Sequence, residues 1–316
     1  MSNDPFINPN DHEAAVQAIV DAHQSTLALS AIPQTLSQNG PEASVYRAAR
    51  QASLRMGFIE ADAACVANAW QKQSERSGRF DAHQWPTEPL DFGIQAFPRT
   101  NSFPACPQQL GLYAVLPDAA WVGRMARAGV PTLQLRFKSD DPAAISREVQ
   151  ASVQAVQGTD ALLFINDHWP EAIAAGAYGV HLGQEDLGTA DLDAIRQAGL
   201  RLGLSTHGYA EMCLAETHAP SYMAMGAVFP TTLKRMKTAA QGTGRLHAYA
   251  KLLREYPLVA IGGIDMTRLP EVMASGVGSV AVVRALIAAK DPEAEARRLS
   301  DAIHGLNHRM HTKSAL

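Results

Sequence analysis

The sequence has little of several features that would define a protein class. Only three cysteines occur in 316 residues, Cys65, Cys106 and Cys213, and their odd number and wide spacing fit neither a disulfide framework nor a structural zinc site. Neither sign of charge dominates, because 27 Lys and Arg face 31 Asp and Glu. No apolar run approaches twenty residues, and the first residues do not resemble a signal peptide. These absences predict a cytoplasmic protein with reduced thiols, and neither nucleic acid nor a membrane as its partner.

Residues 1–107 lack strand signals and predict a mainly helical N-terminal extension. Ranges 12–31 and 43–72 are rich in Ala, Gln and Leu, with apolar residues at helical spacing. Range 74–107 contains repeated X-Pro pairs, which disfavour helix and predict an extended connector. We therefore expect a boundary after residue 107, with a second domain over residues 108–316.

The second domain has a regular alternation that predicts an α/β fold, a (β/α)₈ TIM barrel. Short runs rich in Val, Ile and Leu are each followed by an Ala-rich amphipathic stretch, and there are eight of them. The runs are 110–117, 132–138, 161–167, 179–184, 201–207, 222–229, 258–264 and 278–286. A doubly wound open sheet is the rival fold, but it needs no eight consecutive units, and no GxGxxG follows the first run.

Polar residues gather where the second to fourth runs end. Gln134, Arg136 and Lys138 alternate, so on a strand they share a face, and two cations on one inward stripe indicate an anionic ligand. A solvent-exposed strand end is the alternative. Asp167 ends the third run and Asp186 closely follows the fourth, and paired carboxylates without Cys or His indicate Mg²⁺. Capping of the following helices is the alternative for these aspartates.

The later runs predict a second anion site. Ser205 begins a hydroxyl-bearing strand end that either caps a helix or binds phosphate. Range 230–235 contains hydroxyls and two cations, and the glycines around Gly263 allow backbone amides to approach a phosphate after the seventh run. His181 lies within an apolar run, which favours an interior histidine with its hydrogen bonds satisfied.

Five linked motifs, QLRFK, FINDHWPEAIAAGAYGVHLGQEDL, LGLSTH, VFPTTLK and VAIGGI, closely resemble the thiamine phosphate synthase family over residues 110–292. The resemblance implies that hydroxymethylpyrimidine diphosphate is coupled to a thiazole phosphate, or to its carboxylated form with loss of CO₂. The products would be thiamine monophosphate and diphosphate, formed by a Mg²⁺-assisted dissociative substitution. A homodimer is compatible with this resemblance.

The resemblance also assigns site residues. It implies that Asp167 and Asp186 bind Mg²⁺ and that Arg136, Lys138 and Lys234 neutralise the leaving diphosphate. The substrate contacts that it implies are Gln134, Leu135, Arg136, Phe137, Lys138, Asn166, Ser205 and Lys234 for the pyrimidine diphosphate, and Thr231, Thr232, Leu233, Gly263, Val283 and Arg284 around the thiazole phosphate.

Two positions depart from the family pattern. Leu233 replaces the second Thr of a Thr-x-Thr-Lys loop, and Arg284 replaces a Ser. A guanidinium at position 284 offers a bidentate phosphate contact in place of the lost hydroxyl, or it intrudes on the site. A non-catalytic thiamine-phosphate sensor and a thiazole tautomerase are therefore the alternative functions. Range 57–71 faintly resembles the end of a pyrimidine kinase, but no glycine-rich phosphate loop accompanies it, so we expect no kinase activity.

Overall fold

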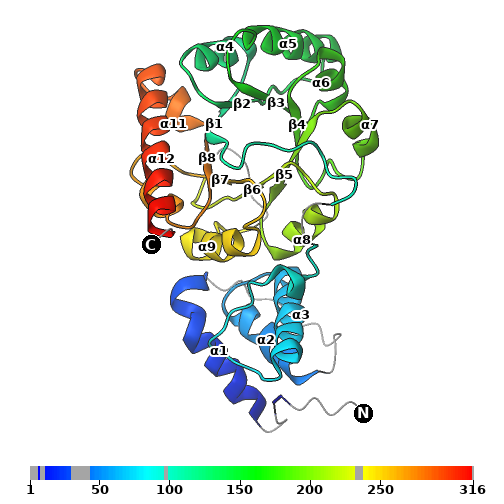
Figure 1. Ribbon diagram of the computed structural model, residues 1–316, viewed down its shortest axis with the longest axis vertical. Coiled ribbons are helices and arrows are strands. Elements are labelled where there is room, and N and C mark those ends of the chain that lie inside the picture. Colours follow the sequence, from blue (N-terminus) through cyan, green and yellow to red (C-terminus); the bar gives the residue numbers. More distant parts are fainter. Residues whose placement is uncertain (1–5, 8–10, 30–42, 96–98, 232–237, 315–316) are drawn as a thin grey trace. The chain divides into compact units, whose positions relative to one another are not determined.

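The computed structural model describes residues 6–7, 11–29, 43–95, 99–231 and 238–314 (Figure 1). The chain forms two compact units. One consists of residues 1–97 together with 208–217, and the other of residues 98–207 and 218–316. The range 208–217 lies between two barrel strands in sequence, although it clusters with the N-terminal residues.

Eight parallel strands form a closed barrel in which each strand pairs with its neighbours in sequence and the last pairs with the first. Figure 1 shows them as a ring with helices outside it. The strands are β1 (Gly111–Leu116), β2 (Thr132–Leu135), β3 (Leu162–Asn166), β4 (Gly179–Leu182), β5 (Arg201–Thr206), β6 (Tyr222–Met225), β7 (Leu258–Ile261) and β8 (Ser279–Val282). The predicted TIM-barrel class is confirmed.

The helices that connect the strands begin and end at residues suited to those positions. Asp118, Asp141 and Asp191 each cap the helix that follows them by accepting a hydrogen bond from a backbone amide in its first turn. Gly176 adopts a left-handed conformation just past its helix. The helices are α4 (Ala119–Arg127), α5 (Pro142–Ala155), α6 (Trp169–Ala175), α7 (Leu192–Gln197), α8 (Tyr209–Thr217), α9 (Gly242–Leu252), α10 (Leu269–Met273), α11 (Arg284–Ile287) and α12 (Pro292–Ser314).

Large aromatic side chains fill the barrel interior because glycines on the adjacent strands make room for them. Tyr113, Phe164 and Tyr222 form one buried cluster. A Cβ atom on Gly203 would lie 2.1 Å from Cζ of Tyr222, and one on Gly179 would lie 2.5 Å from Cε1 of Phe164. The two glycines are therefore requirements of interior packing.

The N-terminal residues are mainly helical, as expected, with α1 (His12–Leu27), α2 (Ser44–Arg55), α3 (Glu60–Ser77) and a short 3₁₀ helix η2 (Pro89–Phe92). The single helix expected over 43–72 is divided into α2 and α3. The break falls at Gly57, whose φ of 79° is left-handed and ends the helical run. Helix α3 also extends beyond residue 72 into the range expected to be an extended connector.

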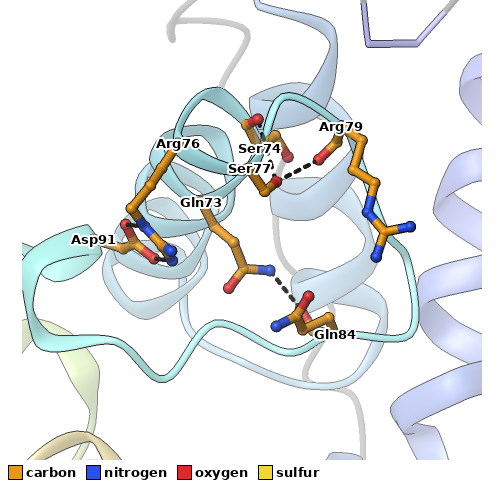
Figure 2. Close-up of polar contacts among 7 residues, drawn as sticks. All are labelled: Gln73, Ser74, Arg76, Ser77, Arg79, Gln84 and Asp91. Atoms are coloured by element: carbon orange, nitrogen blue, oxygen red, sulfur yellow. Dashed lines mark hydrogen bonds and ion pairs between the residues drawn. The ribbon is translucent and has the colours of Figure 1, made fainter.

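Polar contacts fasten the end of α3 to the segment that follows it (Figure 2). Arg76 donates to both carboxylate oxygens of Asp91, at 3.1 and 2.6 Å, and Asp91 is only 2% exposed. Gln73 donates to the backbone oxygen of Gln84 at 2.8 Å. None of the helices in the part of the chain that the structure describes is long and apolar enough to span a membrane.

Candidate active site

The ends of β2 and β3 bring four predicted site residues into two direct contacts. The buried Gln134 donates from Nε2 to Oδ1 of the buried Asn166 at 3.0 Å. Lys138 Nζ donates to Oδ2 of Asp167 at 3.1 Å. Both pairs lie at the carboxyl ends of parallel strands. This is the end of the barrel at which TIM-barrel enzymes bind their substrates.

The expected alternation of Gln134, Arg136 and Lys138 on one strand face is only partly observed, because β2 ends at Leu135. The half-buried Arg136 follows the strand, and its backbone amide donates to the carbonyl oxygen of Leu116 at 2.7 Å. Lys138 lies in the loop with its side chain 63% exposed. Leu135 is buried in the strand, and the half-buried Phe137 accepts a hydrogen bond from His168 through its backbone oxygen at 3.2 Å.

Asp167 is held in an unusual backbone conformation. Its φ of 65° is left-handed, which is uncommon for a residue with a side chain and costs on the order of 1 kcal/mol. Its amide donates to the carbonyl oxygen of His181 at 3.0 Å, and its carbonyl oxygen accepts from the amide of Trp169 at 2.9 Å. Strain of this kind is concentrated at functional sites, so the conformation supports a role for this carboxylate.

Asp186 lies close enough to Asp167 for the two carboxylates to affect each other. Partial burial and the negative charge of Asp167 raise the pKa of Asp186, while hydrogen bonding from Gly183 and the charge of Lys138 oppose that rise. The opposing bond runs from the Gly183 amide to Oδ2 of Asp186 at 2.9 Å. This repulsion is the electrostatic arrangement that a divalent cation relieves.

The alternative that these aspartates cap the following helices does not match the contacts. Helix α7 is capped by Asp191, and α6 begins after His168 without a side-chain cap. Both aspartate side chains make the other contacts described above.

Ser205 is positioned by two residues of β4 and the loop after it. His181 Nε2 lies 2.8 Å from Oγ of Ser205, and Gln184 Nε2 donates to its backbone oxygen at 2.7 Å. The other ring nitrogen of His181 lies 2.7 Å from the hydroxyl of Tyr222, which in turn lies 2.7 Å from the hydroxyl of Tyr113. The buried histidine thus has partners on both sides, in agreement with the interpretation of its sequence context.

The loops after β6 and β7 approach each other through their backbones. Gly262 and Gly263 have φ values of 109° and 64°, and a Cβ on Gly263 would lie 2.8 Å from the carbonyl oxygen of Pro230. Phe229 donates its amide to the carbonyl oxygen of Gly262 at 3.0 Å. Arg268 donates to the carbonyl oxygen of Gly263 and covers the Phe229 ring at 4.5 Å.

The remaining predicted residues are unevenly placed. Thr231 is half-buried in the loop after β6, whereas Thr232, Leu233 and Lys234 lie outside the described residues. Val283 is half-buried after β8, and the exposed Arg284 begins α11. Sequence reasoning missed Gln184 and Arg268. They contact the backbone oxygens of Ser205 and Gly263, and every residue type has such an oxygen, so these contacts leave no pattern in the sequence.

Known proteins resemble the barrel part of this chain. The family model described as "Thiamine monophosphate synthase" matches residues 112–286. A thiamine-phosphate synthase of Neisseria meningitidis serogroup B is 55% identical over 193 residues, which cover 61% of this chain and 94% of that protein. One of Yersinia pseudotuberculosis serotype O:1b is 50% identical over 206 residues, 65% of this chain and 96% of that protein. The structure of a thiamine phosphate pyrophosphorylase from Pyrococcus furiosus matches with a TM-score of 0.55 and 27% identity, and covers 62% of this chain and 96% of that one.

Proposed function

Because this chain belongs to the thiamine monophosphate synthase family and is a transferase, we propose that it couples hydroxymethylpyrimidine diphosphate to a thiazole phosphate or its carboxylated form. Diphosphate leaves, the carboxylated form also loses CO₂, and thiamine monophosphate is the product. The observation that carries the proposal is the contact of Lys138 with Asp167 beside that of Gln134 with Asn166. These contacts place a cation, two amides and a carboxylate at one end of the barrel. We also propose that the protein is cytoplasmic and forms a homodimer.

The diphosphate of the first substrate is assigned to the positive side chains after β2. The exposed amine of Lys138 and the half-buried guanidinium of Arg136 supply positive charge there, and Lys234 is assigned to the same role. Negative charge grows on the departing diphosphate as its bond to the pyrimidine methylene carbon breaks. Fixed cations stabilise the transition state, in which this charge has grown, more strongly than they stabilise the ground state. This difference lowers the activation barrier.

Asp167 and Asp186 fit a Mg²⁺ ion, because hard carboxylate oxygens are its preferred protein ligands. Partial burial, together with the negative charge of Asp167, raises the pKa of Asp186. In the part of the chain that the structure describes, no group of three or more His, Cys, Asp or Glu is arranged to hold a metal. A cation on these two aspartates would take its other ligands from substrate and water, as Mg²⁺ commonly does. When bound, it would supply Lewis-acid neutralisation of the diphosphate.

The thiazole phosphate is assigned to the loops after β6, β7 and β8. Gly263 allows a phosphate to approach backbone amides, and Thr231 and Val283 are assigned as neighbouring contacts. Arg284 is assigned a bidentate phosphate contact that compensates for Leu233.

The chemical step needs no general base. The C–O bond to diphosphate breaks with its electron pair on oxygen, and the electron-rich aminopyrimidine stabilises the resulting methylene cation. The lone pair of the thiazole nitrogen then forms the new N–C bond, which leaves the positive charge on the thiazolium. Catalysis therefore rests on positioning and on charge stabilisation by the residues after β2 and β3.

The direct test is incubation of the purified protein with both substrates and Mg²⁺, followed by detection of thiamine monophosphate. We expect product from the wild type and a loss of kcat of roughly 10² or more in Asp167→Ala. Asp193→Ala is the matched control, because this aspartate is exposed on α7 and forms an ion pair with Arg196, three residues further along the same helix. An inactive wild type would overturn the proposed function, and near-normal turnover by Asp167→Ala would overturn the role of Asp167.

A further inference from the structure

The helix that follows Ser205 obtains its N-terminal cap from a distant part of the chain. The first amides of any helix lack acceptors within the helix. Helices α4, α5 and α7 begin after an aspartate that supplies an acceptor. Helix α8 begins after Gly208, which has no side chain, so its first turn needs an acceptor from elsewhere.

Asp62 of α3 supplies that acceptor. Its Oδ1 accepts a hydrogen bond from the amide of Ala210 at 2.9 Å, although the two residues are 148 positions apart. The Asp62 side chain is buried, with the residue 4% exposed. A Cβ on Gly208 would lie 2.1 Å from Oδ2 of Asp62, so the glycine provides the space that the carboxylate occupies. A negative charge at a helix N-terminus is also favoured by the helix dipole.

Further contacts within the same compact unit hold α8 along its length. The Tyr209 hydroxyl accepts from Nε1 of Trp85 at 2.9 Å, and its ring stacks on Phe92 with centroids 5.2 Å apart. One turn further along, Sγ of Cys213 lies 3.4 Å from Sγ of Cys65. The N-terminal residues thus contact α8 at its first residue, its first turn and its middle.

We propose that Asp62 is a positioning residue for the transferase reaction, an inference that rests on the proposed function. Ser205, assigned to the pyrimidine diphosphate, lies three residues before Gly208 in the chain. His181 and Gln184 hold Ser205 itself, and the cap fixes the start of α8 just downstream. Without the cap, residues 207–208 between β5 and α8 sample other conformations. The end of β5 is then held less tightly, and only a fraction of molecules presents Ser205 correctly. A reduced competent fraction weakens apparent binding of that substrate in proportion.

Asp62 lies outside the part of this chain that the family model matches. The alignment with the Neisseria protein takes in nearly all of that protein but leaves out almost two fifths of this chain. The family match begins at residue 112, so it includes α8 but not Asp62. The positioning role belongs to the N-terminal residues of this chain.

The experiment compares steady-state kinetics of the full-length wild type with Asp62→Ala, Asp62→Asn and Gly208→Ala, with each substrate varied in turn. Loss of a helix cap predicts a rise of about fivefold in the KM for hydroxymethylpyrimidine diphosphate in Asp62→Ala. The KM for the thiazole phosphate should stay unchanged. Asp62→Asn keeps an oxygen acceptor and should recover most of the effect, whereas Gly208→Ala should reproduce it by displacing the carboxylate.

Arg76→Gln is the matched control, because Arg76 lies on the same helix as Asp62 but pairs with Asp91 of η2 (Figure 2). Losing this pair leaves a buried carboxylate without its cation, which loosens the N-terminal residues without removing the cap. An equal rise in KM in Arg76→Gln would overturn the proposal, as would unchanged KM values in Asp62→Ala and Gly208→Ala. If Asp62→Ala fails to fold by circular dichroism, the contrast between Asp62→Asn and Gly208→Ala decides. An inactive wild type would instead mean failure of the proposed function.

Discussion

Tyr222→Phe tests the hydrogen-bonded chain inside the barrel most directly. The Tyr222 hydroxyl lies 2.7 Å from a ring nitrogen of His181 and 2.7 Å from the hydroxyl of Tyr113, with no exposed surface on Tyr222. Removing one oxygen therefore takes a partner from two buried polar groups. Each such loss costs about 1–3 kcal/mol, so we expect the free energy of unfolding to fall by roughly 2–6 kcal/mol.

Tyr113→Phe is the matched comparison, because it removes the other end of the same hydrogen bond. Tyr222 then keeps His181 as its partner, so only one bond is lost and a decrease of about 1 kcal/mol is expected. Urea unfolding followed by circular dichroism gives both values. A loss in Tyr113→Phe that equals or exceeds that in Tyr222→Phe would refute the central position assigned to Tyr222.

The same substitution should reach the proposed site. His181 contacts Tyr222 through Nδ1 and Ser205 through Nε2, so loss of the first contact loosens the ring that holds the second. We expect the KM for hydroxymethylpyrimidine diphosphate to rise in Tyr222→Phe more than in Tyr113→Phe. Equal KM values in the two variants would show that the Tyr222–His181 contact does not contribute to the positioning of Ser205.

Two further predictions concern the N-terminal residues. Burial holds the pKa of His23 below its ordinary value of 6.5, so the unfolded chain takes up this proton first and stability falls as the pH drops below about 6.5. Tryptophan fluorescence should report this loss, because His23 lies edge-on to Trp70 and Trp85, and His23→Gln should reduce the pH dependence. Hydrogen bonding to Cys213 lowers the pKa of Cys65, so its thiolate should attack oxidised glutathione and then yield a Cys65–Cys213 disulfide. Each step releases one reduced glutathione. Mass spectrometry should show the loss of two hydrogens, and Cys213→Ser should retain a glutathione adduct instead; a stable adduct on the wild type would contradict the prediction.

The barrel could be predicted from the sequence because each strand and its helix are recognisable locally. The positions of Asp167 and Asp186 followed from the same logic, because parallel topology brings the carboxyl ends of all strands to one end of the barrel. The break between α2 and α3 was missed because apolar residues keep helical spacing across it, and the left-handed Gly57 interrupts only the backbone. The length of β2 was also overestimated, since alternation of residue types continues past Leu135 into a loop.

Residues that act across long separations could not be predicted in this way. Gln184 contacts β5 through the backbone oxygen of Ser205, 21 positions away, and any residue type provides that oxygen. Cys65 and Cys213 were interpreted as isolated thiols because 148 positions separate them, yet their sulfur atoms lie 3.4 Å apart. In both cases the partner is determined by tertiary packing, which leaves no periodic signal in either segment.

The N-terminal cap of α8 joins a helix inside the family match to a residue outside it. The family match over residues 112–286 includes Ser205, Gly208 and the whole of α8. The acceptor for the first turn of that helix comes from Asp62, outside the match. Glycine before α8 is a weaker local cap than serine or aspartate by a few tenths of a kcal/mol, because it offers no side-chain acceptor. With Asp62 present, a side chain at position 208 would collide with the carboxylate. Glycine at this position therefore gives up a local cap and leaves room for the cap that Asp62 provides.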